Sequence, residues 1–193
     1  MAAVKSAYDW RFGSGRPCLD LVATGTGTSG VCELLDDAGR LADWLLATGL
    51  VPNGTHLGAV DDSRVVRFRQ PRAGVERLLT AEIGGDRRPE GALDALERVN
   101  ALAAEPPPGL RAVRGGGGTS IRTLNGDPEC GALPAAVARD AVELLTDPVA
   151  RAGLRRCEAD NCRRLHLRER VARHRRRVAA AAAVTAVADA DPA

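Results

Sequence analysis

Two cysteines near the C-terminus, Cys157 and Cys162, have the type and the spacing of a metal half-site. With four residues between them, both thiols can reach one ion from a tight turn, a spacing common among zinc ligands. Flanking arginines lower the pKa of a thiol and favour the thiolate that binds metal. A structural zinc ion takes four ligands, and this pair supplies two. His166, four residues after Cys162, is the nearest further donor.

A second histidine, His174, could complete a site of two cysteines and two histidines. If residues 163–183 form one helix, His166 and His174 are roughly 12 Å apart along its axis and about 80° apart around it. Both then reach one ion only if the helix breaks between them. A dimer that shares two thiols per chain is another route to four ligands. We therefore predict a tail that either lacks zinc or binds it loosely.

The same region is densely basic. Residues 1–150 hold 16 Lys and Arg against 20 Asp and Glu, a net charge of −4, whereas residues 151–177 hold 11 Arg against three acidic residues, a net charge of +8. Such a concentration of charge gains most by neutralising phosphates, which favours contact with DNA. The candidate DNA-binding residues are Arg163, Arg164, Arg168, Arg170, Arg173, Arg175, Arg176 and Arg177.

Three stretches of the chain resemble the CGNR zinc-finger family, whose N-terminal part is called the ABATE domain. They are residues 15–24 (GRPCLDLVAT), residues 33–50, and the Cys157–Cys162 pair with its arginines. The resemblance implies a bacterial transcription regulator with a sensing N-terminal domain and a zinc finger on DNA. The second half of that finger is missing, because Val178 and Ala183 stand at its third and fourth cysteines and residues 184–186 replace its Gly-Asn-Arg.

Composition and apolar spacing predict an α+β chain with two parts. Residues 1–150 are expected to form a mainly helical, ABATE-like domain with a small antiparallel hairpin, and residues 151–193 a short basic helical tail with a degenerate finger. Pro71 is expected to kink or end the helix that contains it. The expected elements are a strand at 18–22, helices at 34–45, 65–83 and 93–102, a hairpin at 110–124, a helix at 137–145, and a short helix from Pro148 that leads to Arg155 and Arg156.

Two residues of the body are singled out as a ligand contact or a structural hub. Asp20 lies between Leu19 and Leu21, and a carboxylate among apolar neighbours needs a partner if it is buried. Asp20 is therefore a candidate for either role. Trp44 could stack on a ligand, although a tryptophan on an apolar helical face more often anchors the core.

The sequence argues against several classes of protein. It has no nucleophile elbow, no His-Glu-x-x-His motif and no Ser/His/Asp order, so we do not expect an enzyme. No apolar run reaches the roughly 20 residues that cross a bilayer, and the five cysteines do not form a secreted framework. We expect a cytoplasmic transcription regulator, which could be a homodimer, that binds DNA through its tail and a small-molecule effector through its body. The alternative function is a module without DNA binding, whose finger has decayed and whose body binds a ligand or a protein. For the tail itself, the alternative to DNA contact is a solvated basic segment that docks on the acidic body.

Overall fold

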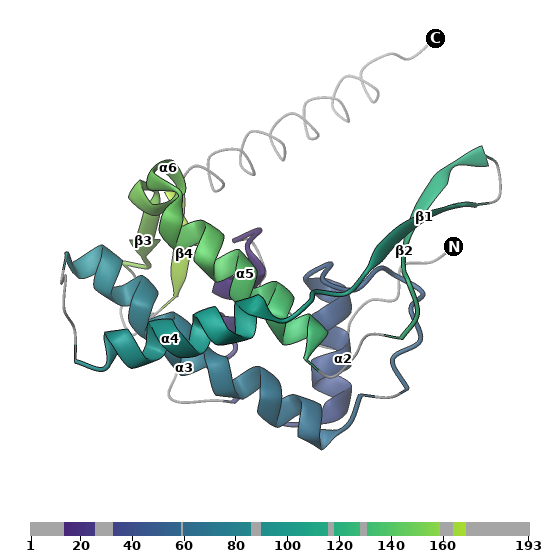
Figure 1. The fold of residues 1–193 in the computed structure, drawn as a ribbon, viewed down its shortest axis with the longest axis horizontal. Coiled ribbons are helices and arrows are strands. Elements are labelled where there is room, and N and C mark those ends of the chain that lie inside the picture. Colours follow the sequence, from purple (N-terminus) through teal and green to yellow (C-terminus); the bar gives the residue numbers. More distant parts are fainter. Residues whose placement is uncertain are drawn as a thin grey trace, which may run out of the picture.

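The computed structural model describes residues 14–25, 33–58, 60–85, 90–115, 118–127, 131–158 and 164–168, which form a mixed α+β fold (Figure 1). The predicted fold class is confirmed. The helices gather into one body, from which the β1–β2 hairpin extends at one end while the β3–β4 hairpin lies at the other. The elements are α1 (Pro17–Ala23), α2 (Ala38–Ala47), α3 (Asp62–Gly84), α4 (Ala92–Ala104), β1 (Leu110–Arg114), β2 (Ser120–Leu124), α5 (Ala132–Thr146), α6 (Pro148–Ala152), β3 (Leu154–Arg156) and β4 (Leu165–Leu167).

Helices α3, α4 and α5 pack against one another at the centre of the body, and α1 packs against α3 and α5. Their common core is mostly aliphatic, as the scarcity of aromatic residues requires. Trp44 on α2 and Phe68 on α3 are its largest fully buried side chains. Their rings meet edge to face with 5.7 Å between centroids, an arrangement that aromatic pairs favour. Trp44 thus joins α2 to α3 inside the core.

The apolar run at residues 18–22 belongs to helix α1, so the predicted strand is wrong. A run this short has no polar face to reveal its period, and spacing alone does not separate a strand from a buried helix. Pro17 favours the helix because its fixed φ suits the first helical turn. The N–H of Cys18 also donates to Asp140 Oδ2 on α5, at 2.9 Å. This cap comes from 122 residues away, where a local pattern cannot reveal it.

Helix α3 runs unbroken through Pro71, where the sequence predicts a kink or an end. Proline lacks an N–H and removes one hydrogen bond, the one that would reach the carbonyl of Arg67. Phe68 and Val75, on either side of Pro71, are buried in the core. Their packing offsets the missing bond, because helical stability in proteins comes mainly from a buried face. Helix α2 is shorter than predicted, since it begins at Ala38.

Two hairpins complete the described fold. The hairpin predicted at residues 110–124 is confirmed, with β1 and β2 paired antiparallel. The short helix expected from Pro148 is confirmed as α6, and it leads to Arg155 and Arg156, which lie in β3. The β3–β4 hairpin corrects one expectation, since Leu165–Leu167 is a strand and not part of a tail helix. The alternation of residues 165–167 explains this, because a period of two turns both leucines to one face, and both are buried.

Candidate functional site: the C-terminal hairpin and its buried support

The β3–β4 hairpin is fixed to the body by three leucines. Leu154, Leu165 and Leu167 are at most 8% exposed and belong to the same core cluster as the helices. Backbone hydrogen bonds extend the pairing on both sides of the strands: the N–H of Cys157 donates to the Arg164 carbonyl at 2.8 Å, and the N–H of Arg168 donates to the Gly153 carbonyl at 2.9 Å. The first residues of the basic segment therefore stand on a packed support.

The predicted metal ligands are only partly described. Cys157 is a half-buried residue next to the end of β3. His166 pairs with Arg155 across the hairpin and is half-buried on the face opposite the leucines. Cys162 lies outside the described residues. Within the described part of the chain no three metal-binding side chains come together. The described donors, Cys157 and His166, would supply two of the four ligands that a structural zinc ion takes.

Three arginines of the hairpin region, Arg155, Arg156 and Arg168, are exposed. Arg155 Nη1 donates to backbone carbonyls of its own turn, those of Ala152 at 2.9 Å and Leu154 at 2.7 Å. No described carboxylate forms an ion pair with any of the three. Within the described residues, their charge is thus open to solvent or to a partner.

Of the predicted DNA-binding residues, Arg164 and Arg168 are described. Arg164 is half-buried, and its charge acts on Asp20. It is therefore partly engaged with the body, unlike Arg168. The remaining predicted residues lie outside the described ranges: Arg163, Arg170, Arg173, Arg175, Arg176 and Arg177.

Asp20 lies beneath this hairpin, on helix α1, which packs against β4. The residue is only 6% exposed, and Ser14 Oγ donates to its Oδ1 at 2.5 Å. Burial raises the pKa of Asp20 from 3.8 to about 6, and the neighbouring Asp140 carboxylate adds to the rise. The hydrogen bond from Ser14 and the charge of Arg164 act in the opposite direction. Asp20 thus interacts both with Ser14, which precedes α1, and with Arg164, which precedes β4.

Asp140 is the second carboxylate of this cluster, and it is paired. Arg16 Nε lies 2.9 Å from Asp140 Oδ1, and Arg16 Nη2 donates to the Asp140 carbonyl at 2.7 Å. The other carboxylate oxygen accepts the N–H of Cys18. Burial, with the Asp140 carboxylate nearby, raises the pKa of the Cys18 thiol well above its usual value. Cys18 is therefore a neutral thiol in the core.

A second polar cluster joins the two N-terminal stretches that carry the resemblance. Arg72 on α3 reaches Glu33 with both ends of its guanidinium, one bond measuring 2.8 Å, and Thr24 Oγ1 at 3.0 Å. Partial burial of Glu33 pushes its pKa upward, but the hydrogen bonds from Arg72 and the Leu35 N–H, with the charges of Arg72 and Arg69, outweigh it and leave the pKa below 4.5. Sequence reasoning missed Arg72, because nothing in its spacing links it to residues 24 and 33.

The family model ABATE, with the description "Putative stress-induced transcription regulator", matches residues 15–148. The chain belongs to the ABATE family. No curated protein matches it. The ABATE match contains α1 with Asp20, the Asp140 carboxylate and the Arg72 cluster; Ser14 and Arg164, which interact with Asp20, lie just outside it, and it ends before β3. The family description gives the ABATE domain a role in the regulation of transcription.

None of the helices in the described part of the chain is both long enough and apolar enough to cross a membrane. The CGNR-type finger lies beyond the ABATE match, so it stays a prediction.

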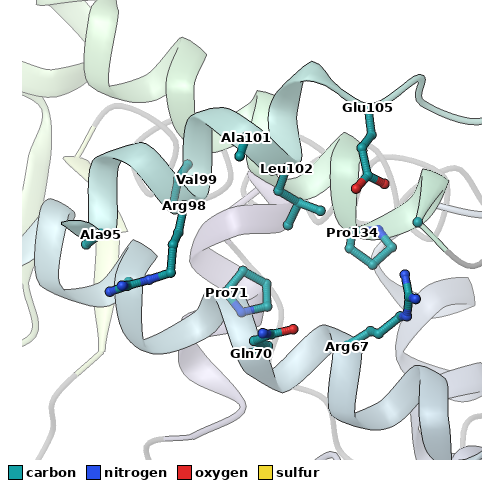
Figure 2. Close-up of a pocket in the computed structure, with 12 residues that line it drawn as sticks. Arg67, Gln70, Pro71, Ala95, Arg98, Val99, Ala101, Leu102, Glu105 and Pro134 are labelled. Carbon is teal, nitrogen blue, oxygen red and sulfur yellow. The ribbon is translucent and has the colours of Figure 1, made fainter. Parts of the chain in front are cut away.

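The ABATE domain also holds a cavity of about 420 Å³ between α3, α4 and the start of α5 (Figure 2). Sequence reasoning missed this site entirely. A weak signal exists, since Arg67, Gln70 and Gly74 are spaced by three and four residues and therefore share one face of α3. The spacing does not tell which other helix that face meets, so the cavity could not be found without the fold.

Proposed function

We propose that this ABATE-family chain regulates transcription by contacting DNA through its arginine-rich C-terminal segment. The observation that carries the proposal is the separation of charge: a net −4 over residues 1–150 against a net +8 over residues 151–177. Each phosphate that an arginine neutralises releases counterions, so a dense basic segment binds DNA strongly at low salt.

The described hairpin supports this proposal in two ways. Arg156 and Arg168 are exposed and have no ion pair with a described carboxylate, although Arg151, the first residue of the segment, pairs with Glu82 of the body. The buried leucines of β3 and β4 fix that start to the core, which limits the freedom that binding would have to remove.

DNA binding is tested with a labelled duplex and fluorescence anisotropy over a range of salt concentrations. The full chain is compared with a chain truncated after Arg168. A truncation at residue 150 would be misleading, because it removes Leu154, Leu165 and Leu167 from the core and would unfold part of the body. We expect the truncation after Arg168 to keep the circular dichroism of the helices and to lose most of the affinity for DNA.

A matched pair of variants separates specific contacts from net charge. Arg175→Gln with Arg176→Gln removes two charges from the segment, whereas Arg77→Gln with Arg139→Gln removes two exposed charges from the body. We expect the first pair to reduce the magnitude of the slope of log K against log [salt] by about one for every phosphate that is no longer neutralised. The second pair should leave the slope unchanged. Equal effects of both pairs would contradict the proposal.

The alternative function, a module that binds a small molecule or a protein without DNA, is favoured by one specific observation, the cavity of the ABATE domain. If the full chain shows no salt-dependent affinity for duplex DNA, this alternative becomes the better account.

A further inference from the structure

The cavity between α3, α4 and the start of α5 has the size and the lining of a small-molecule site. Its volume of about 420 Å³ falls within the range of roughly 300–1,000 Å³ that ligand pockets occupy. Pro71, Val99 and Leu102 give it an apolar floor, and Gly74 and Ala95 leave room because they are small. Most of a ligand's body would therefore contact apolar atoms.

Opposite charges flank one end of the cavity. Figure 2 shows the guanidinium of Arg67 on α3 and the carboxylate of Glu105, at the end of α4, pointing toward one another beside Pro134. The two groups do not form an ion pair, and no ion pair within the described residues includes either side chain. The Glu105 carboxylate packs so closely on Gly131 that a Cβ there would collide with it. One end of the cavity is thus lined by an exposed cation and an exposed anion that do not form an ion pair with each other.

A third charged group stands at the other end. Arg98 on α4 also lines the cavity, and Figure 2 places its guanidinium on the side of Ala95, away from Glu105. Its positive charge disfavours a ligand that carries a second cation at the far end of its body.

We propose that this cavity binds a free α-amino acid with a large apolar side chain. Its carboxylate pairs with the guanidinium of Arg67, a geometry that allows two parallel hydrogen bonds, and its ammonium pairs with the carboxylate of Glu105. Its side chain lies on the floor near Leu102 and Val99. Both side chains are exposed, so a plain organic anion or a plain amine makes one charge-assisted pair and leaves the other group to water, whereas an amino acid makes both pairs. Arg98 disfavours the basic amino acids.

The inference goes beyond the proposed function and does not depend on it. All the residues that line the cavity lie between positions 67 and 134, inside the ABATE match and outside the arginine-rich segment. A chain that fails to bind DNA can still bind an amino acid here, and the reverse also holds.

The test is isothermal titration calorimetry on the full chain, with L-phenylalanine and L-leucine as ligands. Two analogues probe the charged groups: 3-phenylpropanoate lacks the amine, and 2-phenylethylamine lacks the carboxylate. We expect at least one of the two amino acids to bind, and each analogue to bind at least about tenfold more weakly than L-phenylalanine, the change expected when one charge-assisted hydrogen bond is removed. We expect no binding of L-arginine.

Variants then assign the groups. Arg67→Gln is expected to weaken the amino acid at least about tenfold while leaving 2-phenylethylamine unaffected, and Glu105→Gln should do the same while leaving 3-phenylpropanoate unaffected. Arg77→Gln, an exposed arginine on the same helix outside the cavity, is the matched control and should change nothing. Gly74→Leu fills the cavity without altering a charge and should abolish binding.

Three results would overturn the inference. The first is that neither amino acid binds at millimolar concentration. The second is that an analogue lacking one charged group binds as tightly as L-phenylalanine. The third is that Arg67→Gln or Gly74→Leu, with helix content intact by circular dichroism, binds the amino acid with the affinity of the parent chain.

Discussion

The buried carboxyl of Asp20 makes the stability of the fold depend on pH in a defined way. Because Asp20 is only 6% exposed, burial raises its pKa in the folded chain to about 6, whereas the ordinary value is 3.8. A folded chain that holds its proton more tightly than the unfolded chain is stabilised while that proton is present. This contribution is complete below pH 4 and is lost as the pH rises through 6.

The magnitude follows from the two pKa values. A rise from 3.8 to about 6 corresponds to about 3 kcal/mol of unfolding free energy, lost between roughly pH 4 and pH 7. Asp20→Asn cannot titrate, yet its side-chain oxygen can still accept the hydrogen bond from Ser14. We therefore expect the variant to gain up to about 3 kcal/mol relative to the parent chain over this pH window, whatever its stability at pH 4.

The assay is urea denaturation of both chains at half-unit steps of pH, because the difference between them cancels the titration of all other groups. Asp94→Asn, which removes an exposed aspartate from α4, serves as the control for a change in net charge. A carboxyl ¹³C titration of Asp20 by NMR gives the pKa directly. A stability difference between parent and Asp20→Asn that stays flat from pH 4 to pH 7 would refute the argument.

Four further predictions come from the same structure. Gly74→Ala should stabilise the chain by about 0.5–1 kcal/mol in thermal unfolding, because glycine is unfavourable inside a helix. The new Cβ would lie 3.7 Å from the Cβ of Ala95, which is an ordinary contact. A loss of stability would mean that α3 and α4 are closer than described. Leu165→Ala should lower the unfolding free energy by roughly 2–5 kcal/mol, and an effect near zero would show that the hairpin is not part of the core. Arg164→Gln should raise the pKa of Asp20 above 6 in the NMR titration, because it removes a cation that lowers this pKa, and an unchanged value would contradict the coupling. Elemental analysis of tag-free protein should find less than one zinc per chain, and a full equivalent would refute the incomplete site.

The sequence predicts well those elements whose signals are local. Four consecutive glycines between two short segments in which apolar and polar residues are mixed, LRAVR and SIRTL, are sufficient to indicate the β1–β2 hairpin. The Asp147-Pro148 pair marks the start of α6, where the Asp147 side chain accepts the N–H groups of Val149 and Ala150. In both cases the residues that specify the structure are adjacent in the chain, so their chemistry can be read without the fold.

The errors come from long-range contacts. Helix α1 depends on Asp140, which caps it from α5, and the sequence offers no sign of that partnership. Pro71 is tolerated inside α3 because Phe68 and Val75 pack on a core that only the tertiary fold creates. The strand at residues 165–167 is masked by the surrounding arginines, which favour interpreting the whole tail as one basic helix.

The same distinction between local and long-range signals applies to the candidate sites. The types of residue in the C-terminal segment can be read from sequence, but Arg67, Gln70 and Glu105 cannot be recognised, because a cavity is a relation between helices and not a motif. Asp20 is the intermediate case: its apolar neighbours indicate burial, while its partners Ser14 and Arg164 come from a different loop and from the far end of the described chain.

The division of the chain at residue 150 stays a prediction, yet the contacts of the hairpin limit what it can mean. The core of the ABATE body includes the buried side chains of Leu154, Leu165 and Leu167. The positive charge of Arg164 lowers the pKa of Asp20, against the larger upward effect of burial. If the basic segment binds phosphate as proposed, neutralisation of Arg164 is expected to raise the pKa of Asp20, which a carboxyl NMR titration with and without duplex DNA would test.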